Sequence, residues 1–197
     1  MSILSKSQSM GVAAVILAVS TLLSRFMGLV RDKIISWQFG AGGESDMYFA
    51  AFVVPDIINY LLAGGFMSIT LIPLLSKRFS EDEADGWRFY SCVLTWMAVC
   101  AMAVTALGML FAEPLAHVVA PGLDPSRYAR LALFMRIVLP AQVFFLVGSC
   151  IIALLYLRRQ FTIPALTPLI YNGCIIFFGV TLPYSGLVHG MTGYCVG

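Results

Sequence analysis

Long apolar segments constrain this chain more than any other feature of its sequence. A membrane-spanning helix needs about 20 consecutive, largely apolar residues. Such segments cover roughly residues 10–39, 45–75, 89–112, 128–157 and 162–182, and a sixth begins within 186–197. Charged residues make up only 11% of the chain, against about 25% in soluble domains. We therefore expect an all-α, polytopic transmembrane helix bundle with five complete helices and the start of a sixth.

Lysine and arginine in the short loops predict the orientation, because these residues collect on the cytoplasmic side of a membrane. One set of predicted loops carries Lys6, Lys77, Arg78, Arg88, Arg158 and Arg159, and the opposite set carries Arg127 and Arg130. The N-terminus is therefore expected in the cytoplasm, and the acidic run at 80–86 is expected to be the solvated surface of a cytoplasmic loop. The net charge of +2 does not indicate a nucleic-acid partner.

The cysteines and histidines show no metal-binding pattern. Five cysteines stand singly within apolar segments, without a CxxC pair or a histidine at ligand spacing. We therefore expect no metal and no bound cofactor, with a coupling ion or the membrane potential as the energy source for any transport.

The first apolar segment carries charges where a lipid-facing helix would not. An ionisable side chain in the middle of a membrane costs about 2.5–3.5 kcal/mol on insertion scales, so it normally faces protein or water. Residues seven apart share a helix face, which pairs Ser24 with Arg31 and Arg25 with Asp32. Ser24 and Gly28 also form a small-xxx-small pair that permits close approach of another helix. We expect this polar stripe to face a partner helix or a wet cavity.

Other apolar segments add polar groups that could complete such a cavity. Asp46, Asp56 and Asn59 lie in the second segment, and Arg136 lies about two turns into the fourth. Guanidinium groups are permanently charged and match phosphate oxygens. We predict a site for an anionic, phosphate-bearing ligand formed by Ser24, Arg25, Arg31, Asp32, Asp46, Asn59 and Arg136. Internal ion pairs that hold the helices in register are the alternative.

Glycine and proline predict interruptions of the helices. We expect weak points or hinges at Gly28, Pro55, Gly64 and Gly65. Transporters build midplane sites from discontinuous helices, although proline is also common in membrane helices generally.

These residues also carry a family resemblance. The stretch SRFMGLVRD at 24–32, followed by FGAGGESDMYFAAFVVP at 39–55, resembles the opening of the MurJ/MviN lipid II flippases of the MOP exporter superfamily. Later stretches resemble the family in the same order: APG at 120–122, RIVLP at 136–140 and RRQFTIPALTPLIYN at 158–172. The resemblance extends over nearly the whole chain.

The resemblance implies a fold and a function. Members have two six-helix lobes and two further helices around a cavity that opens alternately to the two sides of the bacterial inner membrane. Residues 1–197 would form the N-terminal lobe, with the C-terminal lobe absent from this sequence, and the cargo would be a polyprenyl-pyrophosphate-linked saccharide. Arg25 and Arg31 would contact the lipid pyrophosphate or headgroup, and Asp46 would orient them or act at the gate.

The sequence departs from the family in its second apolar segment. Asn59 and Tyr60 stand where the family usually has arginines, and Gly64 stands at its glutamate. The loss of a cation should weaken the binding of a pyrophosphate. The departure marks a divergent member and leaves the cargo open between lipid II and a different polyprenyl-linked saccharide.

Three other functions can be weighed against the sequence. A multidrug exporter of the same superfamily would favour acidic and aromatic cavity residues over arginines. An intramembrane enzyme acting on polyprenyl phosphates would need a nucleophile and an acid–base pair at the interface, which the sequence does not show, so we expect no enzyme. A truncated, non-transporting scaffold or partner subunit is the third possibility.

Overall fold

The structure is a computed structural model that describes residues 10–40, 42–61, 70–186 and 188–197. These residues form helices and turns without a strand, which confirms the all-α bundle. The elements are α1 (Met10–Phe39), α2 (Gly43–Ala51), α3 (Val53–Asn59), α4 (Ile72–Glu81), α5 (Glu83–Leu110), α6 (Ala112–Val119), the short 3₁₀ helix η4 (Pro125–Arg127), α7 (Tyr128–Val138), α8 (Ala141–Leu157), α9 (Thr162–Tyr184) and α10 (Thr192–Val196).

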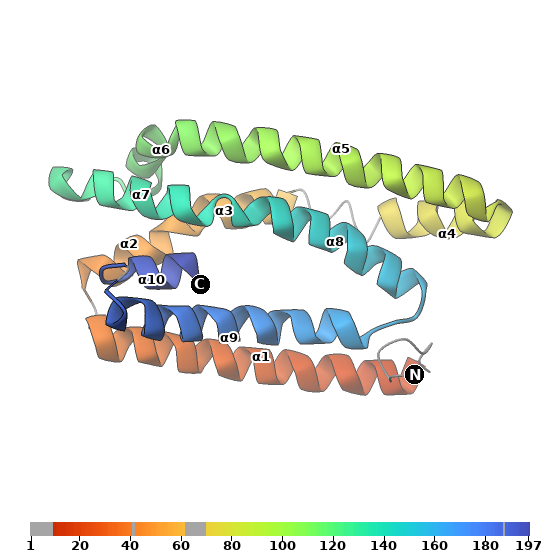
Figure 1. Cartoon of the computed structure of the whole chain (residues 1–197), viewed down its shortest axis with the longest axis horizontal. Helices are drawn as coiled ribbons and strands as arrows, with labels where there is room; N and C mark the ends of the chain where they lie inside the picture. Colours follow the sequence, from red (N-terminus) through yellow and green to blue (C-terminus); the bar gives the residue numbers. More distant parts are fainter. Residues whose placement is uncertain (1–9, 41, 62–69, 187) are drawn as a thin grey trace.

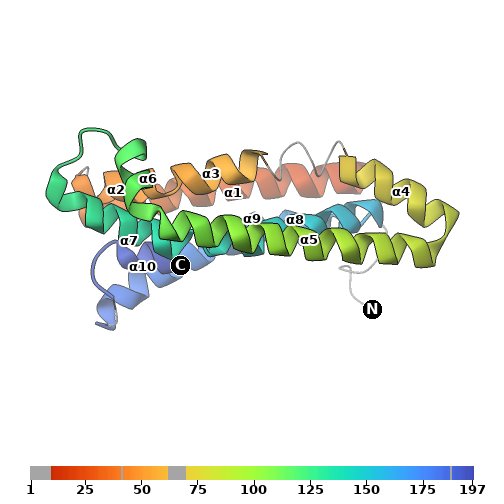
Figure 2. The same cartoon turned by 90° about the horizontal axis from the view of Figure 1, so that it is seen from above.

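The bundle is elongated and has two main layers (Figures 1 and 2). One layer contains α1 and α9, which lie side by side and run in the same direction. The other contains α5, which runs antiparallel to α7 and α8, with α4 packed at one end (Figure 1). At the opposite end α2 and α10 lie between the layers. One end of the bundle holds the beginning of α1, the α4–α5 junction and the α8–α9 turn. The chain therefore runs along the length of the bundle several times.

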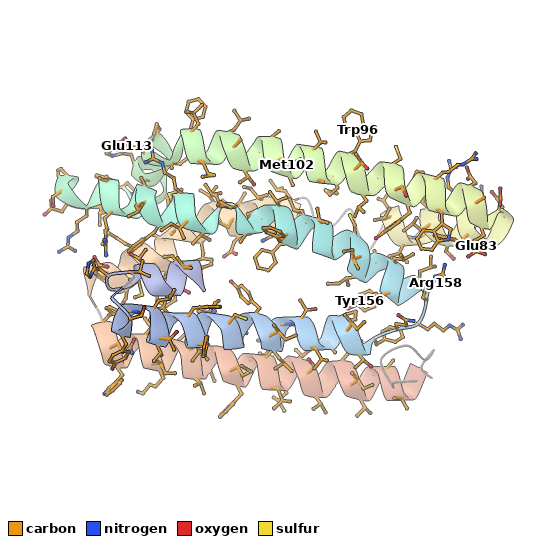
Figure 3. The ribbon with its side chains drawn as sticks, in the orientation of Figure 1. Glu83, Trp96, Met102, Glu113, Tyr156 and Arg158 are labelled. Atoms are coloured by element: carbon orange, nitrogen blue, oxygen red, sulfur yellow. The ribbon has the colours of Figure 1, made fainter. Side chains whose placement is uncertain are left out.

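Among the described residues, four helical segments are long and apolar enough to cross a membrane: Gly11–Phe39, Glu83–Leu110, Pro125–Leu157 and Thr162–Tyr184. Their outer surfaces are apolar. Trp96 on α5, for example, projects away from the bundle (Figure 3) and is 65% exposed, and Met102 on the same helix is 52% exposed. Such surfaces suit contact with lipid, because these helices are both apolar and long enough to cross a membrane. The chain is a multi-pass membrane protein.

Two of the expected helical segments are broken at or near a proline. The expected second segment is divided at Phe52, between α2 and α3. Pro55 has no N–H to donate to the carbonyl of Ala51, so the regular ladder cannot continue through this turn. The fourth segment is likewise divided at Pro140, between α7 and α8.

The expected interruption at Gly28 is wrong. Helix α1 continues through this residue, and a Cβ placed on Gly28 would meet nothing within 4 Å, so Gly28 does not serve a close helix approach either. A single glycine inside a helix costs only about 1 kcal/mol relative to alanine, which the packing of α1 along α9 outweighs. The predicted weak points Gly64 and Gly65 lie outside the described residues.

The acidic run at 80–86 is not merely a solvated loop, as the sequence suggested. Helix α5 begins at Glu83, several residues before the expected start at 89, because the Asp82 carboxylate accepts a hydrogen bond from the backbone N–H of Ala84 at 2.9 Å. Carboxylates also stabilise a first helical turn. Asp85 pairs with Arg78 at 2.7 Å, and Glu83 pairs with Arg158 at 3.5 Å. Figure 3 shows Glu83 and Arg158 at the same end of the bundle.

Candidate functional site

Arg31 is the charged residue of α1 that the fold encloses most clearly. Its side chain is only 20% exposed, and its Nε and Nη2 both lie 3.0 Å from Oδ1 of Asp32. Nη1 donates to Oδ1 of Asn172 on α9 at 3.2 Å. A carboxylate from the same helix and an amide from the neighbouring helix therefore hold the guanidinium.

Asn172 connects this charged group to the rest of the α1–α9 interface. The residue is buried, and its Nδ2 donates to the carbonyl of Pro168 at 3.0 Å and to Oγ of Ser24 at 3.4 Å. Nearer the start of α1, the Ser20 hydroxyl donates to the carbonyl of Ala165. We call Ser20, Ser24, Arg31, Asp32, Ala165, Pro168 and Asn172 the α1–α9 polar network.

The network leaves Arg31 capable of binding an anion. A guanidinium carries five N–H donors. Hydrogen bonds engage Nε and Nη1, and Nη2 lies in ion-pair contact with Asp32, so at least two of the five N–H groups have no partner among the residues that the structure describes. Guanidinium donors suit a phosphate or carboxylate.

Tyr48 on α2 adds a polar group beside this network. The residue is 1% exposed, and its hydroxyl has no hydrogen-bond partner within the described residues. The hydroxyl is close enough to Arg31, Asp32 and Tyr171 to interact with them electrostatically. Unpaired buried hydroxyls are rare, so this one marks a polar point between α1, α2 and α9.

Several residues predicted for the site do not join the network. Arg25 and Asp46 are exposed and make no ion pair with any residue that the structure describes, while Asn59 is half-buried at the end of α3. Arg136 is exposed on α7, and its Nε donates to the carbonyl of Met109 at 3.3 Å. The structure therefore brings together Ser24, Arg31 and Asp32 but not the predicted group of three arginines; any ligand role of the others stays a prediction.

A second polar cluster at the far end of the bundle was not predicted. Glu44 on α2 forms an ion pair with Arg130 on α7 at 3.3 Å, and the Arg130 guanidinium also lies 5.0 Å from the ring centre of Phe134. A pocket of about 440 Å³ adjoins this pair. The Arg127 guanidinium packs so closely on Gly43 that any Cβ there would overlap it.

Asn172 and Tyr48 were the main omissions of the sequence reasoning. Asn172 was visible as the last residue of the stretch RRQFTIPALTPLIYN, where a polar amide interrupts an apolar helix. Such intramembrane polar residues usually face a partner helix, and this signal could have singled it out. Nothing local marked Tyr48, because tyrosine is also common at membrane interfaces.

Comparison with known proteins shows where this arrangement belongs. The family model described as lipid II flippase MurJ matches residues 35–191. The chain belongs to the MurJ family. This match contains α2 to α9, including Asn172 and most of the elements around the α1–α9 polar network.

Curated MurJ relatives resemble most of the chain. A probable lipid II flippase MurJ of Buchnera aphidicola subsp. Acyrthosiphon pisum is 31% identical over 166 residues, which cover 83% of this chain and 32% of the relative. The lipid II flippase MurJ of Thermosipho africanus is 26% identical over 185 residues, or 94% of this chain and 38% of the relative. The chain thus spans about a third of the length of the curated MurJ proteins that it matches.

Proposed function

We propose that this chain belongs to a flippase that moves a polyprenyl-pyrophosphate-linked saccharide, lipid II or a related cell-envelope precursor, across the bacterial inner membrane by alternating access. The observation that carries the proposal is the match of residues 35–191 to the MurJ family. The protein would act as a transporter and not as an enzyme. Its N-terminus would lie in the cytoplasm, since the arginine-rich α4–α5 and α8–α9 junctions share one end of the bundle.

Arg31 supports this proposal through its remaining donors. The two free N–H groups can bind a diphosphate oxygen while Asp32 and Asn172 keep the side chain in place. Placing such a site on rigid helices limits the entropy lost when the ligand binds. Arg25 would contribute from another face of α1, as the family resemblance suggests.

Native mass spectrometry of the purified chain tests the proposal. Wild type is compared with Arg31→Ala, and with Arg88→Ala as a matched control that removes an equal charge from an exposed position on α5. Wild type and the control should retain an undecaprenyl-pyrophosphate saccharide, while Arg31→Ala should retain at least tenfold less, because charge-assisted hydrogen bonds contribute about 1.5–3 kcal/mol each. Equal retention in all three, or no such lipid in wild type, would refute the proposed function.

A further inference from the structure

We infer that Asn172 is a positioning residue that aims the Arg31 guanidinium at the diphosphate of the ligand; this inference rests on the proposed function. Asn172 belongs to α9 and Arg31 to α1, and the 3.2 Å hydrogen bond between Oδ1 and Nη1 joins residues 141 positions apart. Asn172 would act through Arg31 and need not touch the ligand.

The surroundings of Asn172 fix the direction of its amide. Nδ2 donates both to the carbonyl of Pro168, one turn earlier in α9, and to Oγ of Ser24 on α1. A flipped amide would point its N–H groups at the Arg31 guanidinium, which is itself only a donor. Because Asn172 is 7% exposed, water cannot replace the lost contacts. The oxygen therefore stays directed at Arg31.

This oxygen holds the Nη1 end of the Arg31 guanidinium against α9, while Nε and Nη2 contact Asp32. The Asp32 side chain is 46% exposed and follows Arg31 directly in the sequence, so it can move with the guanidinium but cannot hold it against α9. With Asn172 in place, the engaged hydrogens are divided between two sides of the fork. Without it, only Asp32, which moves together with Arg31, would hold the guanidinium. The remaining donors would then no longer be kept in one direction relative to α9.

A double-mutant cycle on the chain in lipid nanodiscs tests this role, with undecaprenyl pyrophosphate as the probe. Asn172→Ala should weaken binding about tenfold. In an Arg31→Ala background the same substitution should change binding less than twofold, because the group that Asn172 positions is gone. Thr167→Ala is the matched control: this exposed hydroxyl on α9 donates to the carbonyl of Ile163 on the same helix, and its loss should leave binding unchanged.

A measurement without ligand separates positioning from a general loss of structure. In ¹⁵N-arginine NMR spectra, Asn172→Ala should speed rotation about the Nε–Cζ bond of Arg31 at least fivefold, whereas Thr167→Ala should not. The Arg31 signal is assigned by its absence from the Arg31→Lys spectrum. Unchanged rotation in Asn172→Ala would overturn the inference.

The outcomes distinguish the inference from the function beneath it. If wild type binds the probe and the two alanine substitutions weaken binding additively, Asn172 acts independently of Arg31 and the inference alone fails. If wild type does not bind the probe, the proposed function fails and takes the inference with it.

Discussion

Gly179 provides a sharp test of the packing between α9 and α10. A Cβ on this residue would lie less than 3.0 Å from three ring carbons of Tyr194. Tyr194 is 1% exposed, and its hydroxyl donates to Oε1 of Gln38 at 2.6 Å. Its ring lies nearly perpendicular to the rings of Phe39 and Tyr48, with ring-centre distances of 6.0 and 6.4 Å. Gly179→Ala therefore requires the ring to move.

The expected loss of unfolding free energy is the balance of three effects. Overpacking a filled core typically costs about 1–3 kcal/mol. Displacing the ring also strains or breaks the Tyr194–Gln38 hydrogen bond, which contributes about 1 kcal/mol. Alanine recovers up to about 1 kcal/mol of helix propensity relative to glycine. We expect Gly179→Ala to lower the free energy of unfolding by about 1–3 kcal/mol.

Unfolding in mixed micelles with increasing SDS, followed by circular dichroism, measures this difference. Gly148→Ala on α8 is the matched control, since a Cβ there meets nothing within 4 Å; it should be neutral or stabilising by up to about 1 kcal/mol. In a Tyr194→Ala background the cost of Gly179→Ala should disappear. Equal stability of Gly179→Ala and wild type would show that the contact is not tight and would refute the reasoning.

Two further predictions concern single polar groups. The buried Thr105 hydroxyl on α5 has no hydrogen-bond partner within the described residues, so Thr105→Val should leave the free energy of unfolding unchanged or raise it by up to about 1 kcal/mol; a loss larger than 1 kcal/mol in the same SDS titration would indicate a partner. In the loop before η4, hydrogen bonds from the backbone N–H and the hydroxyl of Ser126 hold the pKa of Asp124 below its usual 3.8. Since the native pKa is lowered, the stabilisation by this cap is complete above the unfolded-state pKa and is lost as the pH falls through the native one. A ¹³C-carboxyl NMR titration should give a midpoint below 3.8 that rises in Ser126→Ala, and a midpoint at or above 3.8 would contradict the capping.

Local sequence determined the class of fold and most of the helical segments. The length of each apolar run shows that it can cross a membrane, because the hydrocarbon thickness sets that length. The breaks near Pro55 and at Pro140 also have local causes, since proline lacks the N–H that the helix needs. The motifs around Arg31 and Asp46 were sufficient to indicate the MurJ family, which the family comparison then showed.

The local sequence pattern did not predict which residues the acidic side chains at 80–86 would contact. The acidic run appeared to be a loop because its charges interrupt the apolar pattern. In the structure Asp82 caps α5, Glu83 pairs with Arg158 just after α8, and Asp85 pairs with Arg78 on α4. At Gly28 the local pattern predicted a break in the helix that the structure does not have. Glycine weakens an isolated helix, but α9 packs along α1 on both sides of this position.

The composition of the site was decided by the tertiary structure. Helical periodicity placed Ser24 and Arg31 on one face of α1, as the structure has them, but could not say which helix that face meets. The parallel packing of α1 on α9 supplies Asn172 from 141 residues away, and the same packing leaves Arg25 on an exposed face. Arg136 lies in the other layer and bonds to Met109. Periodicity fixes the direction of a side chain around its own helix, whereas the distance between two side chains depends on how separate helices pack, which no local stretch encodes.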